Sequence, residues 1–143
     1  VVVCRIDEPD AIAEAHGGPV LDRVVVALAQ LLKGTFGKEL KVYRTSTQCV
    51  AMFLPLLAAR RTAQLLRQVQ ARIAPEYEYE RHGVKRSVVF TFSAVVVQSA
   101  GKEPTDARDA LVRAETQVTQ LEGLSQLEAE ASGIGRLVGW LSS

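Results

Sequence analysis

The hydrophobic and polar residues of the chain follow two periods, one typical of strands and one typical of helices. Apolar or β-branched runs bounded by polar residues predict strands at Val1–Ile6, Val42–Arg44 and Cys49–Leu54. Apolar residues spaced by three and four predict helices that end near His16, span Leu21–Leu32, and cover about Ala58–Ile73 and Thr105–Glu122. The chain is therefore expected to mix strands and helices.

The ends of the first two helices carry local signals. Asp7, Pro9 and Asp10 are typical of a cap, a first-turn proline and a first-turn acid. Gly17-Gly18-Pro19 separates the two helices, and Gly34 and Gly37 are expected to close the second.

The segment "EYEYERHGVKRSVVFTFSAVVVQ" alternates charged and aromatic residues before a long apolar run. It predicts two strands joined around His82-Gly83, the second of them buried. The glycine-interrupted tail predicts a short edge strand at Arg136–Trp140. This order indicates one sheet with helices packed on it. Without the first short helix and the extra hairpin strand it is βαββαβ, so we expect an α+β fold with a ferredoxin-like core, a mainly antiparallel sheet flanked by helices.

Length and composition indicate a single globular domain over residues 1–143, with 48% apolar and 23% charged residues. The formal net charge of +1 predicts no general attraction to nucleic acid or to an anionic membrane. No apolar run approaches the ~18 residues of a membrane span, and no signal-peptide pattern is present. Because the chain begins inside a hydrophobic run without Met, we expect a domain of a longer protein. We also expect a cytoplasmic location, in which the domain could be tethered to a membrane protein.

The two cysteines, Cys4 and Cys49, lie in apolar strand-like runs without metal-ligand spacing, so buried reduced thiols are expected. A nucleophile pair of Cys49 with His16 or His82 is disfavoured, because a catalytic thiol needs an exposed and electropositive setting. We interpret His16 as a helix-end residue and His82 as a turn residue.

Four separated blocks of the sequence keep one register. They are "RIDEPDAIAEAHGGPVLDRVV", "RTSTQCVAMFLP", "RSVVFTFSAVVV" and "LVRAETQVTQLEG". Together they resemble the GGDEF domain of bacterial diguanylate cyclases, and the resemblance covers nearly the whole chain. The matching residues outside the second block are Asp7, Gly17, Asp22, Thr91, Ser93, Ala114 and Glu115.

In the second block, the family has Arg-x-Gly-Gly-Asp-Glu-Phe, then alternating apolar residues and Leu-Pro. Arg44 and Leu54-Pro55 match this pattern. The five signature positions therefore fall on Ser46, Thr47, Gln48, Cys49 and Val50. The turn also lacks the Gly, Asn-Gly or Asp-Gly chemistry of a tight hairpin.

The resemblance implies that the family's metal site is lost. In active members, divalent metals bridge GTP phosphates and carboxylates, and Mg²⁺ prefers such hard oxygen ligands. Arg5 stands where the family has a metal-binding Asp, and Gln48 and Cys49 replace the signature acids. Ser46 and Thr47 replace the glycines that let phosphate approach the backbone. We therefore expect no catalytic residue, no metal and no cofactor.

Two nucleotide-binding positions also differ from the family. Ala13 replaces the Asn that recognises guanine, and Glu122 replaces the phosphate-binding Lys of the last helix. The product-inhibition motif Arg-x-x-Asp falls on Gly37-Lys38-Glu39-Leu40, which lacks both defining residues.

Asp22, Arg44 and Arg5 are the candidates for residual nucleotide binding. Arg5 could grip an anion, or it could form an internal ion pair with Asp7 or Asp22, and we favour the ion pair.

Two further features have a functional and a structural interpretation. The basic run from Arg60 to Arg86, with Tyr77 and Tyr79, could meet nucleic acid, phospholipid or an acidic partner. We favour a solvated helix face with cross-strand Glu–Arg pairs. Trp140 could contact a neighbouring domain or cover the end of the core, and both interpretations stay open.

The expected function is that of a catalytically inactive GGDEF-like module in a bacterial cyclic di-GMP-related signalling protein. It would act in regulation, dimerisation or scaffolding, with a partner protein, an adjacent domain or a second copy, and with no nucleic acid. One alternative is an allosteric receptor for GTP or cyclic di-GMP. Another is an unrelated ferredoxin-like domain that binds protein or RNA.

Overall fold

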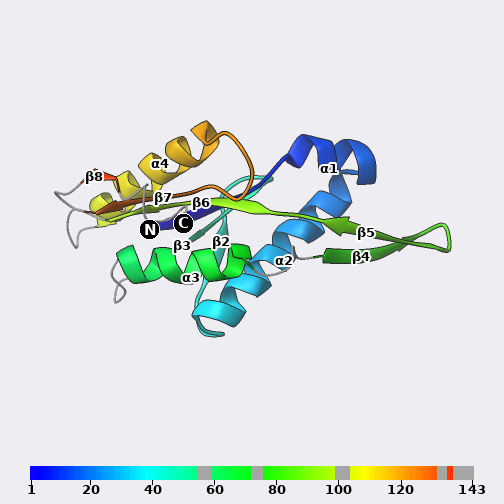
Figure 1. The fold of residues 1–143 in the computed structure, drawn as a ribbon, viewed down its shortest axis with the longest axis horizontal. Helices are drawn as coiled ribbons and strands as arrows, with labels where there is room; N and C mark the ends of the chain where they lie inside the picture. Colours follow the sequence, from blue (N-terminus) through cyan, green and yellow to red (C-terminus); the bar gives the residue numbers. More distant parts are fainter. Residues whose placement is uncertain (55–58, 72–75, 99–103, 132–134, 137–143) are drawn as a thin grey trace.

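The computed structural model describes residues 1–54, 59–71, 76–98, 104–131 and 135–136 of the chain. Its elements, in chain order, are β1 (Val2–Ile6), α1 (Pro9–His16), α2 (Gly18–Phe36), β2 (Val42–Arg44), β3 (Cys49–Met52), α3 (Ala59–Ala71), β4 (Glu76–Arg81), β5 (Val84–Val89), β6 (Phe92–Val97), α4 (Pro104–Gln120), β7 (Leu127–Ala131) and β8 (Gly135–Arg136) (Figure 1).

The main sheet has the strand order β2-β3-β1-β6-β7-β8. Its neighbouring strands are antiparallel except β6 and β7, which are parallel and joined through α4. The elements β1, α2, β2, β3, α3 and β6 form a βαββαβ unit with the order β2-β3-β1-β6, so the predicted ferredoxin-like core is confirmed.

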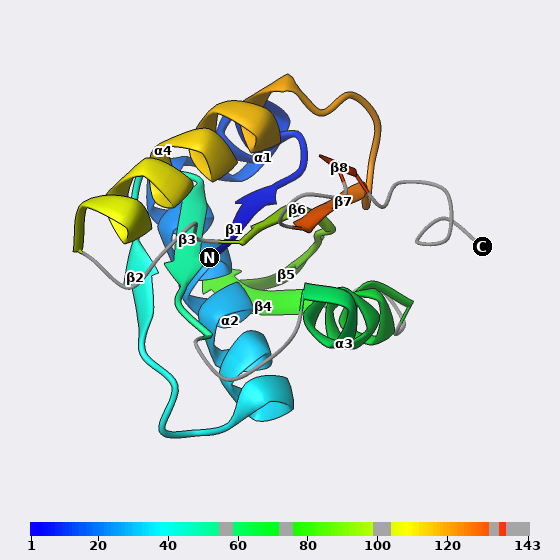
Figure 2. The ribbon, with the colours of Figure 1, turned by 90° about the vertical axis from the view of Figure 1, so that its left-hand side faces the viewer.

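The two faces of the sheet pack against different helices. Alternate residues of β1 point to opposite faces, so Val2, Cys4 and Ile6 belong to one core cluster and Val3 to another. The first cluster contains the buried stripes of α2 and α3, and the second contains the stripe of α4. Figure 2 shows α4 on one side of the sheet and α2 and α3 on the other. Ala110 and Ala114 are fully buried, and these small side chains let α4 approach the sheet closely.

Strands β4 and β5 form a separate two-stranded ribbon that projects from the body of the molecule (Figure 1). His82 and Gly83 join them with φ of 53° and 77°, the two positive values that a type I′ turn requires. The prediction of one sheet, with one buried strand after this turn, is therefore wrong. Most of β5 is exposed, and the buried strand is β6, which begins at Phe92 after a break at Phe90 and Thr91.

Two other predictions about elements need correction, and one strand was not predicted. Asp7 does not cap α1, because Glu8 occupies that position with φ of 50°, and no side-chain hydrogen bond from the described residues caps α1. Gly34 lies inside α2, which extends to Phe36 and is followed by Gly37. Strand β7 was missed, although Leu-Glu-Ala-Glu-Ala has the period of two that predicts a strand.

The structure describes only the start of the predicted edge strand Arg136–Trp140, where β8 covers Gly135–Arg136. Trp140, Ile73 and Pro55 lie outside the described residues. Within the described ranges, no helix is both long and apolar enough to cross a membrane.

Candidate functional site

The five signature positions lie where β2 turns into β3, at the end of the sheet beside β1. The Thr45 N–H donates to the Cys49 carbonyl at 3.1 Å, and the Ile6 N–H donates to the Gln48 carbonyl at 2.9 Å. The Gln48 N–H also donates to the Ser46 Oγ at 3.3 Å. The Ser46 hydroxyl therefore accepts a backbone hydrogen bond within a turn that contains no glycine.

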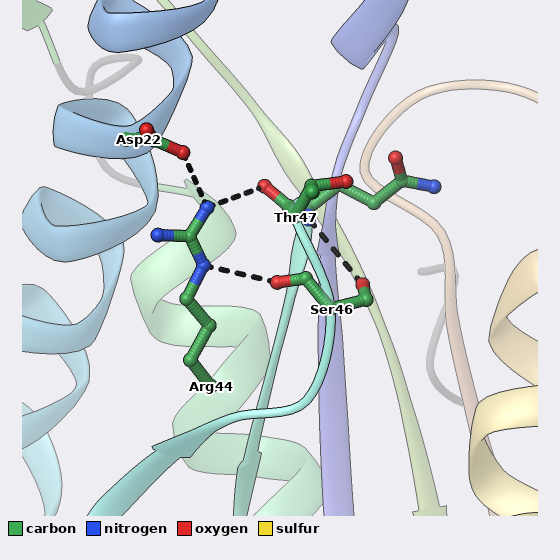
Figure 3. A network of polar contacts seen from close by, with 5 residues as sticks. Asp22, Arg44, Ser46 and Thr47 are labelled. Atoms are coloured by element: carbon green, nitrogen blue, oxygen red, sulfur yellow. Dashed lines mark hydrogen bonds and ion pairs between the residues drawn. The ribbon is translucent and has the colours of Figure 1, made fainter.

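Arg44 closes over this turn. Its Nε donates to the Ser46 carbonyl at 3.0 Å, and one of its Nη atoms donates to the Thr47 carbonyl at 3.0 Å. The same Nη atom lies 2.5 Å from Oδ1 of Asp22 in α2. Figure 3 shows the guanidinium pointing toward the turn on one side and toward Asp22 on the other. The structure thus brings together two of the three predicted nucleotide-binding residues, and they bind each other.

Arg5 lies on the opposite face of the sheet from Arg44. Residues directly opposite across paired strands share a face, and Arg44 pairs with Val50 of the α2 and α3 cluster. Arg5 pairs with Cys49, which belongs to the α4 cluster. The three predicted residues therefore do not form one binding site.

The Arg5 guanidinium contacts the end of α4. Its two Nη atoms donate to the carbonyls of Thr119 and Leu121 at 3.3 and 3.1 Å. Carbonyls in the last turn of a helix lack intrahelical donors, and this end of the helix dipole favours a cation. The expected ion pair of Arg5 with Asp7 or Asp22 is therefore wrong, because the helix end attracts the guanidinium instead.

Asp7 is a buried carboxylate that joins three segments. Its Oδ2 accepts hydrogen bonds from the Thr91 hydroxyl at 2.7 Å and the Ser125 N–H at 2.8 Å. Its Oδ1 accepts from the Ser93 hydroxyl at 2.6 Å, and Ser93 in turn accepts from the Gln126 N–H at 3.1 Å. This network fastens β1 to β6 and to the loop before β7, so Asp7 has a structural role that the sequence did not reveal.

The two cysteines are buried, as predicted. Burial raises the pKa of the Cys4 thiol. Burial also raises the pKa of the Cys49 thiol, against smaller opposing effects of a hydrogen bond with Ser46 and of the Arg5 charge. Neither thiol is an activated nucleophile.

The two histidines contact neither cysteine in the described structure. His16 ends α1 and its Nδ1 lies 2.6 Å from the Tyr79 hydroxyl, whereas His82 is in the ribbon turn. Both positions agree with their predicted structural roles. Among the residues that the structure describes, no group of three or more His, Cys, Asp and Glu side chains could hold a metal ion.

In the helical part of the basic run, an arginine contacts the rest of the fold. In its strand part, the residues opposite the glutamates differ from those expected. Arg67 donates to the Ser125 carbonyl at 2.7 Å. In the ribbon, Glu80 lies opposite Lys85 and Tyr79 lies opposite Arg86, so the register does not give the expected Glu–Arg pairs. Tyr79 stacks on the neighbouring tyrosine at 6.2 Å and packs partly buried against the core, which leaves it poorly placed to stack on a base.

The comparisons with known proteins identify the fold. No protein-family model matches the sequence, and no curated protein matches it. The chain is similar to the FimX GGDEF domain from Pseudomonas aeruginosa, with 15% identity, a TM-score of 0.62, and coverage of 88% of this chain and 76% of that chain. The chain is also similar to the GGDEF domain of DgcB from Caulobacter crescentus in complex with c-di-GMP. The identity is 16% and the TM-score is 0.65, with coverage of 90% of this chain and 75% of that chain.

A third similar structure is the active GGEEF domain of a diguanylate cyclase from Vibrio cholerae. It is 14% identical, with a TM-score of 0.63 and coverage of 90% of this chain and 80% of that chain. These likenesses agree with the resemblance found in the sequence and with the βαββαβ core. The chain therefore adopts the fold of GGDEF domains.

Proposed function

We propose that the chain is a GGDEF-like module without cyclase activity, which acts through protein interaction in a bacterial cyclic di-GMP-related signalling protein. The observation that carries this proposal is that both arginines near the signature positions donate hydrogen bonds to groups of the chain itself. Arg44 binds Asp22 and the carbonyls of its own turn, and Arg5 binds the end of α4.

The lost chemistry supports the same conclusion. Phosphoryl transfer between two nucleotides depends on metal ions that neutralise phosphate charge, and such ions need carboxylate ligands. Gln48 supplies a neutral amide, and the buried Cys49 supplies a protonated thiol. Arg5 lies opposite Cys49 across β1 and β3, where its positive charge would repel a divalent cation.

A second function, binding of GTP or cyclic di-GMP without turnover, is favoured by one observation. The Arg44 and Asp22 side chains are 40% and 58% exposed, so a phosphate could compete with the Asp22 carboxylate for the guanidinium. Such a site would have only one of the three expected residues to hold the anion, since Asp22 is itself acidic and Arg5 lies on the other face.

Titration calorimetry with GTP and with cyclic di-GMP, each with and without Mg²⁺, tests both functions. The proposal predicts no binding heat for either nucleotide up to hundreds of micromolar, and no cyclic di-GMP after prolonged incubation with GTP. Micromolar binding that Arg44→Ala abolishes would establish the receptor function instead. Synthesis of cyclic di-GMP would overturn both.

A further inference from the structure

The outer edge of β5 lies open in the described structure. Strand β5 pairs with β4 and with no other strand among the described residues. The two-residue turn makes Arg81 and Val84 a hydrogen-bonded pair, and such pairs alternate along an antiparallel ladder. The backbone N–H and C=O groups of Lys85, Ser87 and Val89 therefore point away from β4, available to another strand.

Helix α1 forms the opposite wall of a groove along this edge. The groove has a volume of about 360 Å³, and α1 contributes Ala11, Ile12 and Ala15 to its lining. Figure 1 shows α1 on the β5 side of the ribbon. The Asp7 N–H donates to the Thr91 carbonyl at 3.0 Å, so the start of α1 lies near the end of β5. The small side chains of Ala11 and Ala15 leave space between the helix and the strand.

The chemistry at the Asp7 end of the groove defines what could occupy it. Val89 and Leu124, which both line the groove, are 61% and 53% exposed and would gain from apolar contact. Asp7 is already bound by three protein donors, so the exposed Glu8 is the carboxylate left to attract a partner cation. A partner with apolar side chains and a basic residue is complementary to this end.

We propose that this groove binds an extended peptide of a partner protein, which adds to β5 as a third strand. The peptide has apolar side chains at alternate positions and a Lys or Arg beside Glu8. This mode of recognition obtains affinity from backbone hydrogen bonds and specificity from alternate side chains. The inference rests on the proposed interaction function and assigns it a surface.

Selection from a displayed library of random ten-residue peptides against the full chain tests the proposal. We expect selected peptides to alternate apolar and polar residues, with a basic residue at one end. Binding should perturb the backbone amide resonances of Ser87 and Val89 most strongly, and N-methylation of alternate peptide bonds should weaken binding at least tenfold.

Matched variants of α1 distinguish binding in the groove from nonspecific peptide binding. Ala15→Arg fills the groove and should weaken peptide binding at least tenfold, whereas Glu14→Arg, on an exposed neighbour that does not line the groove, should leave it unchanged. Glu8→Lys should change the selected end residue from basic to acidic. Failure to select any peptide, or equal binding by Ala15→Arg and the unchanged chain, would overturn the proposal. The nucleotide calorimetry decides the proposed function separately, since it probes the other turn.

Discussion

Asp22 and Arg44 are 22 residues apart in the chain, and their side chains meet at 2.5 Å beside the turn that follows β2. The contact joins α2 to the β2–β3 hairpin on one face of the sheet. On the other face, Arg5 joins β1 to the end of α4. Both arginines therefore donate to groups of the chain itself at the end of the sheet that carries residues 46–50.

Removal of the Arg44 side chain should destabilise the chain modestly. An exposed ion pair contributes ~0.2–1 kcal/mol, and the two bonds to turn carbonyls raise the expected loss for Arg44→Ala to about 1–2 kcal/mol. Asp22→Asn should cost less than about 1 kcal/mol. Urea unfolding of both single variants and the double variant measures the coupling, which should fall as salt increases. If the losses of unfolding free energy in the two single variants add up to the loss in the double variant, the contact does not stabilise the fold.

Substitution of Arg5 should affect the end of α4. Arg5→Asp removes two donors and places a negative charge at the negative end of the helix dipole, so we expect a loss of about 2–4 kcal/mol. Arg5→Met should cost less, because it also removes the buried Nε, which has no hydrogen-bond partner among the described residues. Hydrogen exchange should report faster opening at Thr119 and Leu121 in both variants. Equal unfolding energies for the two variants would contradict the role of charge.

The sequence predicted the elements whose signals are local. The apolar stripes of α2, α3 and α4 and the β-branched run of β1 each repeat within a few residues, and burial of those positions confirmed them. The break between β5 and β6 has no such signal, because Val88–Val97 is largely continuous in apolar character. At the break, the Thr91 hydroxyl donates a hydrogen bond to Asp7, 84 residues away in the chain.

The sequence suggested candidate site residues but not how they are arranged in space. An internal ion pair of Arg5 with Asp7 or Asp22 was expected because such structural pairs are common, whereas the partners of Arg5 are carbonyls more than a hundred residues later. Strand alternation alone could not show that Arg5 and Arg44 occupy opposite faces, because that depends on the register of β3 between β1 and β2.

Neutralising Asp7 should be costly. Asp7→Asn keeps one oxygen acceptor and directs an amide N–H₂ toward a hydroxyl or backbone donor, which leaves buried hydrogen-bonding groups unpaired. The expected loss is about 2–4 kcal/mol. Thr91→Val removes a single donor and should cost less. Thermal unfolding followed by circular dichroism measures both. A change below about 0.5 kcal/mol in Asp7→Asn would show that the network does not hold the strands together.

The buried thiols should weaken the fold in alkaline solution. Burial raises the folded-state pKa of Cys4 and Cys49 above their ordinary value of 9.0. The unfolded chain therefore loses these protons first, so their contribution is fully present below pH 9 and declines as pH rises further. Each group contributes a slope of up to ~1.4 kcal/mol per pH unit. Unfolding energies between pH 8 and 11 should fall more steeply in the unchanged chain than in a Cys4→Ala/Cys49→Ala variant. Parallel profiles would refute this account.

Installing the family signature at residues 46–50 should not create a cyclase. The variant Ser46→Gly/Thr47→Gly/Gln48→Asp/Cys49→Glu/Val50→Phe introduces a charge and a larger ring at two positions that are 4% and 2% exposed, so a loss of several kcal/mol is expected.

The carboxylate at position 49 would also face Arg5 across the strand pair, where the guanidinium would bind it in place of a metal. Adding Arg5→Asp removes that competitor and leaves several acids together. We therefore expect 10 mM Mg²⁺ to raise the melting temperature of the six-fold variant and not of the five-fold variant, with cyclic di-GMP undetectable by chromatography for the latter. Stabilisation of the five-fold variant by Mg²⁺, or product from it, would show that Arg5 does not block the metal position.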